Sequence, residues 1–186
     1  MPRSVLLVLA HPAYHRSRAG RALIAAVEPL PDVRIHDLYE TYPDLLVDVK
    51  HEQDLLGAHE ILVFQHPLYW YSAPALLKEW IDVVLTHGFA YGRNGTALRG
   101  KHWLTAVTAG GRPEAYHETG VNRFPLEELL RPFEATAKLC GCLWQSPHIL
   151  FGSHLAEGPD LAAAGAQYAA RIRALQEETT LRSIHE

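Results

Sequence analysis

The sequence predicts an α/β protein with a doubly wound parallel sheet. Three observations support this fold class: strand-like and helix-like segments alternate five times, the first strand-like segment is apolar throughout, and no repeat or linker divides the chain. The 186 residues are enough for one sizeable core. We expect a single domain over residues 1–186, with an ordered core from about residue 4 to residue 178 and fraying after about Glu178.

Five segments have the composition of strands. Residues 5–10 form a continuous apolar run, residues 33–38 alternate in polarity, and residues 61–65 are again apolar. Residues 101–108 and 148–151 complete the set. Five strands fit the flavodoxin-like order 2-1-3-4-5 better than a six-stranded dinucleotide-binding sheet, whose glycine fingerprint is absent after the first strand.

Segments with helical periodicity or helix-capping residues lie between and after these strands. Ser17 can cap the first helix and Pro29 ends it, and Asp48 caps the second after a loop at residues 39–47. Pro132 predicts a kink or a late start in the fourth helix. The last three helices are expected at residues 74–86, 125–140 and 161–175.

The charge balance gives no reason to expect a nucleic-acid partner. The formal net charge is -4, whereas nucleic-acid binding usually requires a basic stripe. The chain is also less acidic than a small electron carrier that docks by charge. No pair of histidines has a convincing metal-binding spacing such as H-E-x-x-H, so we expect no metal.

Cysteine usage and the amino-terminal residues predict a cytoplasmic protein. Cys140 and Cys142 are too close in sequence for a good disulfide, so we expect buried thiols in a reducing compartment. The first apolar run stops at Ala10, before His11 and Pro12, and is too short for a signal peptide or a membrane span. Any membrane association would have to come through a partner.

The loops after the first, third and fourth strands should converge at the carboxyl edge of the sheet, where doubly wound proteins bind ligands. In the first loop, Ser17 lies at the start of a helix between Arg16 and Arg18. Free helix amides and positive charge suit a phosphate, although a simple helix cap is the better interpretation of Ser17 taken alone. Residues 108–111 include two adjacent glycines, which allow a sharp turn or the close approach of a flat group.

The loop after the third strand carries three adjacent aromatic residues, Tyr69, Trp70 and Tyr71, between Pro67 and Pro74. These side chains offer wide, flat faces that suit a planar ring system. Capping of the sheet or a dimer contact is an equally compatible interpretation. Together with the phosphate site and the glycine loop, they describe one elongated pocket that fits the shape of flavin mononucleotide (FMN).

The motifs in these loops resemble those of a known family. A-H-P follows the first strand, Q-H-P-L-Y-W-Y-S-x-P-A-L-L-K-E-W-I-D includes the end of the third, and T-x-G-G ends the fourth. Together they resemble the flavodoxin-like NAD(P)H:quinone oxidoreductases. H-D-L-Y-x-x-Y-P-D at residues 36–44 and N-R-F-P…L-R-P-F-E at residues 122–134 resemble, within that family, the ancillary proteins of glutathione-regulated potassium-efflux antiporters. The similarity runs from about residue 5 to residue 151.

This resemblance implies a homodimeric flavoprotein that passes a hydride from NAD(P)H to FMN, or alternatively FAD, and then to a quinone. The flavin would be bound by residues of three loops. The implied residues are His11, Ser17, Arg18, Ala19 and Gly20 from the first loop, Pro67, Leu68, Tyr69, Trp70 and Tyr71 from the second, and Thr108, Ala109, Gly110 and Gly111 from the third.

The resemblance also implies catalytic residues. Tyr116 matches the family tyrosine that hydrogen-bonds the flavin ring and steadies charge during hydride transfer. Two departures from the family pattern bear on catalytic rate more than on flavin binding. Gly20 stands where the family often has Asn, and Asn122 stands where better-known quinone reductases have a second catalytic histidine, a role that nearby His117 could take.

Two functions from different classes are compatible with these residues. The first is a flavin-dependent NAD(P)H:quinone oxidoreductase with ping-pong order, which could also activate a potassium-efflux antiporter. The alternative is a non-catalytic regulatory subunit bound to the cytoplasmic face of a potassium/proton antiporter, peripheral on the inner side of the cell membrane. A one-electron carrier is disfavoured by the mild charge, and a hydrolase by the absence of G-x-S-x-G.

We interpret His66 as a structural anchor rather than a base.

Overall fold

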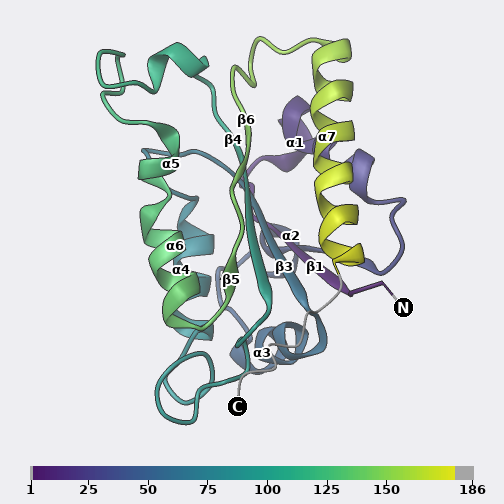
Figure 1. Ribbon diagram of the computed structural model, residues 1–186, viewed down its shortest axis with the longest axis vertical. Helices are drawn as coiled ribbons and strands as arrows, with labels where there is room; N and C mark the ends of the chain where they lie inside the picture. The colour runs from purple at the N-terminus through teal and green to yellow at the C-terminus, as the bar shows by residue number, and fades with distance from the viewer. Residues whose placement is uncertain (1, 179–186) are drawn as a thin grey trace.

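A parallel sheet runs through the middle of the molecule, and helices cover both of its faces (Figure 1). The computed structural model describes residues 2–178, so the expected fraying after Glu178 lies outside the described residues. The strands are β1 (Val5–Leu9), β2 (Val33–Asp37), β3 (Ile61–Pro67), β4 (His102–Thr108), β5 (Leu143–Trp144) and β6 (His148–Leu150). Their order is β2-β1-β3-β4-β5, with β6 also paired to β4, which confirms the predicted fold class and strand order.

The last edge of the sheet differs from the prediction because it consists of two short strands instead of one. β5 pairs with the start of β4, His102 opposite Leu143, and β6 pairs with its end, Ala106 opposite His148. Between these two pairings, residues 145–147 of the edge lie opposite residues 104–105 of β4, so the edge has one extra residue. Pro147 lies in that connection and has no amide hydrogen to donate to a neighbouring strand, which is consistent with the interruption.

The helices form a layer on each face of the sheet (Figure 1). Alternate residues of β1 point to opposite layers: Leu6 and Val8 lie in a core cluster with Leu55 and Trp80, and Leu7 lies in a cluster with Leu23 and Tyr168. This two-sided burial explains the continuous apolar run. The helices are α1 (Arg18–Val27), α2 (Leu38–Thr41), α3 (Val49–Ala58), α4 (Ala75–Val84), α5 (Leu126–Leu129), α6 (Arg131–Leu139) and α7 (Gly158–Glu177), with short 3₁₀ turns η1 (Tyr14–Arg16) and η2 (Pro113–Ala115).

Two segments differ from the simple loop and the single helix expected there, and in each case one residue explains the difference. The expected loop at residues 39–47 begins inside α2, because the carboxylate of Asp37 accepts hydrogen bonds from the Tyr39 and Glu40 amides and caps that turn. The expected helix at residues 125–140 is divided into α5 and α6, with Pro132 in the first turn of α6, which confirms the predicted break.

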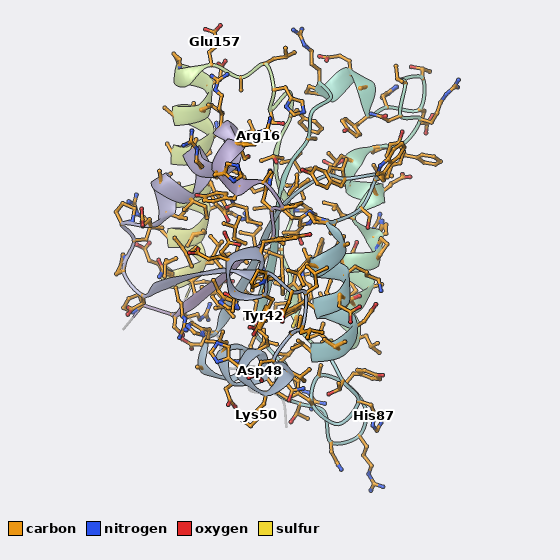
Figure 2. The ribbon with its side chains drawn as sticks, turned by 180° about the vertical axis from the view of Figure 1, so that it is seen from behind. Arg16, Tyr42, Asp48, Lys50, His87 and Glu157 are labelled. Carbon is orange, nitrogen blue, oxygen red and sulfur yellow. The ribbon has the colours of Figure 1, made fainter. Side chains whose placement is uncertain are left out.

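The carboxyl and amino edges of the sheet form opposite ends of the molecule. Arg16, which follows β1, lies toward one end, and His87, in the loop between α4 and β4, lies at the other (Figure 2). Cys140 and Cys142 are both buried free thiols, as predicted. Among residues 2–178, no helix is long and apolar enough to cross a membrane.

Candidate functional site

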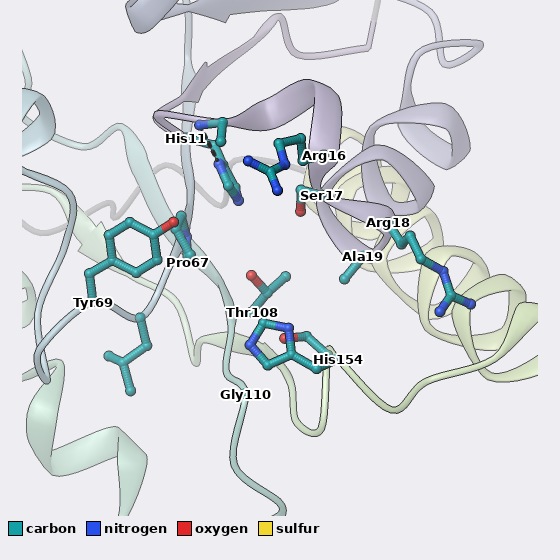
Figure 3. Close-up of a pocket in the computed structure, with 13 residues that line it drawn as sticks. His11, Arg16, Ser17, Arg18, Ala19, Pro67, Tyr69, Thr108, Gly110 and His154 are labelled. Atoms are coloured by element: carbon teal, nitrogen blue, oxygen red, sulfur yellow. Dashed lines mark hydrogen bonds between the residues drawn. The ribbon is translucent and has the colours of Figure 1, made fainter.

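A pocket of about 320 Å³ lies at the carboxyl edge of the sheet (Figure 3). This volume is within the usual range of small-molecule sites. Loops that follow β1, β3, β4 and β6 form its walls. The lining residues are His11, Ala13, Arg16, Ser17, Arg18, Ala19, Pro67, Leu68, Tyr69, Thr108, Gly110, Ser153 and His154.

The start of α1 forms one wall of this pocket. The Ser17 hydroxyl oxygen accepts a hydrogen bond from the Gly20 amide at 3.0 Å, so Ser17 is the cap of α1. Because they lie in the first turn, the amides of Arg18 and Ala19 have no acceptor inside the helix, and the cap uses only the Gly20 amide. The Ser17 hydroxyl hydrogen also remains available as a donor. The two interpretations of Ser17, helix cap and anion ligand, are therefore compatible. Gly20 does not line the pocket, and its amide is used by the cap.

His11 lies beside this helix start with a defined orientation. Its Nδ1 accepts a hydrogen bond from the Ala13 amide at 3.1 Å, so the proton of the neutral ring is on Nε2. Burial lowers the pKa of His11, partly opposed by its own backbone and by the carboxylate of Asp37. The ring is therefore a neutral hydrogen-bond donor at pH 7.

The lining is rich in groups that favour an anion. Two arginines and two histidines contribute to it, and none of its thirteen residues is Asp or Glu. This distribution contrasts with the formal net charge of -4 for the whole chain. Helix amides and the Arg16 side chain together suit an anion such as a phosphate, whereas the Arg18 guanidinium extends away from the cavity (Figure 3).

The aromatic loop after β3 is a tight turn with an unusual backbone. Tyr69 and Ser72 exchange two backbone hydrogen bonds, of 3.0 and 2.9 Å, around Trp70 and Tyr71, which have φ values of 46° and 63°. Positive φ at both central positions is usually left to Gly or Asn, so two bulky residues here indicate local strain of the kind found at functional sites. Only Tyr69 of the three aromatics lines the pocket, and Trp70 is 93% exposed.

The glycine loop after β4 approaches its neighbours closely. A Cβ atom at Gly111 would lie 2.9 Å from the Tyr116 ring, so a larger residue would displace that ring. The Thr108 carbonyl accepts the Leu68 amide at 2.9 Å and joins this loop to the aromatic loop. The side chain of Ala109 is fully buried in the core and does not line the pocket.

Of the three residues considered for catalysis, two lie near the aromatic loop and one has its contact elsewhere. The Tyr116 ring packs against Phe151 beside Gly111, and burial raises its pKa, with a further increase from Tyr71. Asn122 accepts a hydrogen bond from the Tyr71 hydroxyl at 3.3 Å. His117 instead pairs with Thr119 through Nδ1 at 3.1 Å, within its own exposed loop. Tyr116 and Asn122 are thus both close to the aromatic loop.

Sequence reasoning did not select several residues that contribute to the site. Ser153 and His154 line the pocket from the loop after β6. Gln65 supports it from below, because its amide donates to the Gly20 carbonyl at 3.1 Å while its buried Oε1 has no partner among residues 2–178. The signal for Ser153 and His154 was their place after the last strand, at the same edge as the other loops.

The described residues fit a flat, phosphorylated cofactor. The cationic wall at α1 suits its phosphate, and Leu68, Tyr69 and Gly110 line the pocket toward the aromatic loop. Gly111 and Tyr116 do not line this pocket, although the Tyr116 ring lies directly on Gly111. The site is continuous over four loops, which is required of a ligand that is charged at one end and aromatic at the other.

Comparisons with known proteins identify a family and several relatives of similar sequence and fold. A family model described as "Flavodoxin-like fold" matches residues 3–175. The glutathione-regulated potassium-efflux system ancillary protein KefG of Pectobacterium carotovorum is 48% identical over 166 residues, which cover 89% of this chain and 90% of that protein.

Two solved structures are similar over nearly their whole length. The general stress protein 14 of Treponema denticola, in complex with FMN, is 38% identical, with a TM-score of 0.88 and coverage of 93% of this chain and 99% of that chain. An NADPH-quinone reductase from P. pentosaceus is 31% identical, with a TM-score of 0.81 and coverage of 95% and 99%.

Proposed function

Because this chain belongs to the family of proteins with the flavodoxin-like fold, we propose that it is a flavin-dependent NAD(P)H:quinone oxidoreductase that binds FMN at the carboxyl edge of its sheet. One observation carries the proposal: a pocket without carboxylates that joins the cationic start of α1 to the aromatic and glycine loops. The FMN complex of the Treponema denticola protein supports the choice of FMN over FAD. The names of the relatives support both a reductase and an antiporter-associated role.

The residues of this chain have separate tasks in the proposed complex. Ser17 and the amides of Arg18 and Ala19 bind the phosphate. The neutral His11 ring lies beside them and can donate a hydrogen bond from Nε2 to the same phosphate. The backbone of Leu68, Gly110 and Gly111 holds the flat ring. Bound FMN would supply the chemistry, a two-electron hydride transfer from NAD(P)H and then to a quinone. If the two substrates used the same part of the pocket in turn, the reaction would follow ping-pong order.

Tyr116 is the proposed catalytic residue. Burial raises its pKa, so the phenol stays protonated and can donate a hydrogen bond to the edge of the ring, where negative charge develops. Asn122 is proposed as a positioning residue, since it accepts the Tyr71 hydroxyl hydrogen bond and fixes the aromatic loop. Among residues 2–178, His117 is hydrogen-bonded to Thr119 and not to the aromatic loop, which favours Asn122 over His117 for the second role.

We also propose that the protein is a homodimer. The hydrogen bond between Tyr71 and Asn122 joins two segments whose neighbouring apolar side chains are exposed, Trp70 at 93% and Val121 at 89%. Large exposed apolar groups beside a site are typical of an interface. A second copy of this chain would cover them.

The alternative function is that of a non-catalytic regulatory subunit on the cytoplasmic face of a potassium-efflux antiporter. The identity with KefG supports this role, and it would place the protein in the cytoplasm, peripheral to the membrane through its partner. The two functions are compatible if the enzyme also regulates transport.

An absorbance experiment tests the enzyme proposal. The purified protein, reconstituted with FMN, should show flavin bands that bleach when NADPH or NADH is added without oxygen and return when a quinone is added. A Tyr116→Phe variant should bind FMN as the native protein does and bleach more slowly, because only the donor to the ring is removed. Absence of flavin bands after incubation with FMN would overturn the enzyme proposal. In that case, activation of the antiporter by the native protein and by the Tyr116→Phe variant alike would support the regulatory alternative.

A further inference from the structure

The loop after β6 is held firmly against the glycine loop after β4. The Ala109 amide donates to the Leu150 carbonyl, the Ser153 amide donates to the Ala109 carbonyl, and the Gly152 amide donates to the Gly111 carbonyl, each at 2.9 Å. Gly152 has φ of 61°, a backbone conformation that favours glycine and turns the chain back toward the pocket. The residues that follow Gly152 are therefore placed by the scaffold of the sheet.

This loop sets the imidazole of His154 directly on Gly110. A Cβ atom at Gly110 would lie 2.8 Å from Cδ2 and 2.9 Å from Nε2 of His154. Any other residue at position 110 would therefore force the ring away. The absence of a side chain at Gly110 brings an imidazole nitrogen to the floor of the pocket.

His154 lies across the pocket from the start of α1. Figure 3 shows its ring on one side of the cavity and Arg16 and Ser17 on the other, all within the same lining. With no carboxylate among the lining residues, the ring has no acidic partner inside the pocket. Its nitrogen atoms are thus available to a ligand anion.

Resting on the proposed function, we propose that His154 is a phosphate-binding residue for FMN, which holds the phosphate from the wall opposite Arg16 and Ser17. The α1 side supplies amides and the Arg16 guanidinium, and the imidazole closes the same anion site from the β6 side (Figure 3). A bond from each wall would fix the phosphate end of the ligand in position as well as bind it.

Binding of FMN and of riboflavin, which lacks the phosphate, separates this role from others. Quenching of flavin fluorescence gives both dissociation constants for the native protein and for His154→Ala. The Kd for FMN should rise about tenfold in the variant, as expected for loss of a hydrogen bond to a charged group. The Kd for riboflavin should stay unchanged. His154→Gln, which keeps a donor, should recover part of the FMN affinity.

A matched control is His87→Ala, because His87 is also exposed and lies at the other end of the molecule (Figure 2). This variant should bind FMN as the native protein does. The inference is overturned if His154→Ala leaves FMN binding unchanged, or if it weakens FMN and riboflavin equally, which would indicate a contact with the ring system or a change in the loop. If the native protein fails to bind FMN, the proposed function is wrong and this inference falls with it.

Discussion

At the scale of single residues, the contacts of His66 show how a buried histidine can anchor the start of the aromatic loop. Its Nδ1 donates to the Pro67 carbonyl at 2.9 Å, and its ring packs against Phe133. Nε2 is buried without a hydrogen-bond partner in the part of the chain that the structure describes. Burial lowers the pKa of His66 to about 4, so the ring is neutral at pH 7. This environment supports the interpretation of His66 as a structural anchor.

We predict that this histidine destabilises the protein in mild acid. Because the folded-state pKa lies below the unfolded value, the stabilisation is complete above about pH 6.5 and is lost as the pH falls toward 4. The loss from this residue should reach about 3 kcal/mol at most. Urea unfolding between pH 7 and pH 4.5 measures it.

The matched control is His66→Asn, whose side-chain amide can keep the donor near the position of Nδ1 but does not titrate. The variant should be less stable at pH 7, because the smaller side chain leaves a cavity beside Phe133. Its stability should nevertheless fall less steeply with acid than that of the native protein. Parallel pH profiles for the two proteins would contradict the assignment.

Site residues could be predicted from the sequence only where they follow or end a strand that has a clear pattern. Ser17, Tyr69 and Thr108 follow or end strands with clear patterns, and the structure places all three in the pocket. His154 has no neighbouring motif, so its place after the last strand is a weak signal, and the three-dimensional contact with Gly110 is what assigns it to the pocket. The left-handed turn at Trp70 could not be predicted, because bulky residues rarely adopt it.

At the scale of elements, one buried carboxylate joins four segments. Glu52 of α3 has no exposed surface and accepts hydrogen bonds from His36 of β2 at 2.7 Å, Tyr42 after α2 at 2.6 Å and Trp80 of α4 at 2.8 Å. Burial alone would raise the pKa of Glu52, but these three partners outweigh it and lower the pKa. The network therefore fixes α3 against β2 and α4.

We predict that Glu52→Gln destabilises the fold by about 3 kcal/mol. The amide oxygen can still accept from His36 and Tyr42, but the amide nitrogen would face the Trp80 N–H, so two donors would meet in the core. Chemical denaturation at pH 7 measures the loss. Glu79→Gln, an exposed change on α4, should alter stability by less than about 0.5 kcal/mol. Equal effects of the two substitutions would show that the network adds nothing.

Element boundaries could be predicted from the sequence where the apolar period was long. The predictions were wrong where a single polar group determines the start of an element. The helix in α4 was placed by its stripe, whereas α2 exists because Asp37 caps one turn. The two-residue strand β5 is too short to have a pattern. The partners of Glu52 are distant in sequence, so no local pattern indicates them.

At the scale of the whole molecule, the proposed FMN site joins distant parts of the chain. Its walls contain His11 after β1 and His154 after β6, so a bound ligand connects segments that the unfolded chain keeps far apart. Because the unfolded chain lacks this pocket, binding should stabilise only the folded state. FMN at a hundred times its Kd should add about 2.7 kcal/mol and raise the melting temperature by about 5–10 °C.

Riboflavin at the same concentration should raise the melting temperature less, because it cannot use the cationic wall at α1 or His154. Inorganic phosphate alone should give a small increase and should reduce the difference between FMN and riboflavin, since it competes for that wall. Thermal unfolding followed by circular dichroism, which flavin fluorescence does not disturb, measures all three. Equal shifts from FMN and riboflavin would mean that the loops close around the ring alone, and the anion site would then have another ligand.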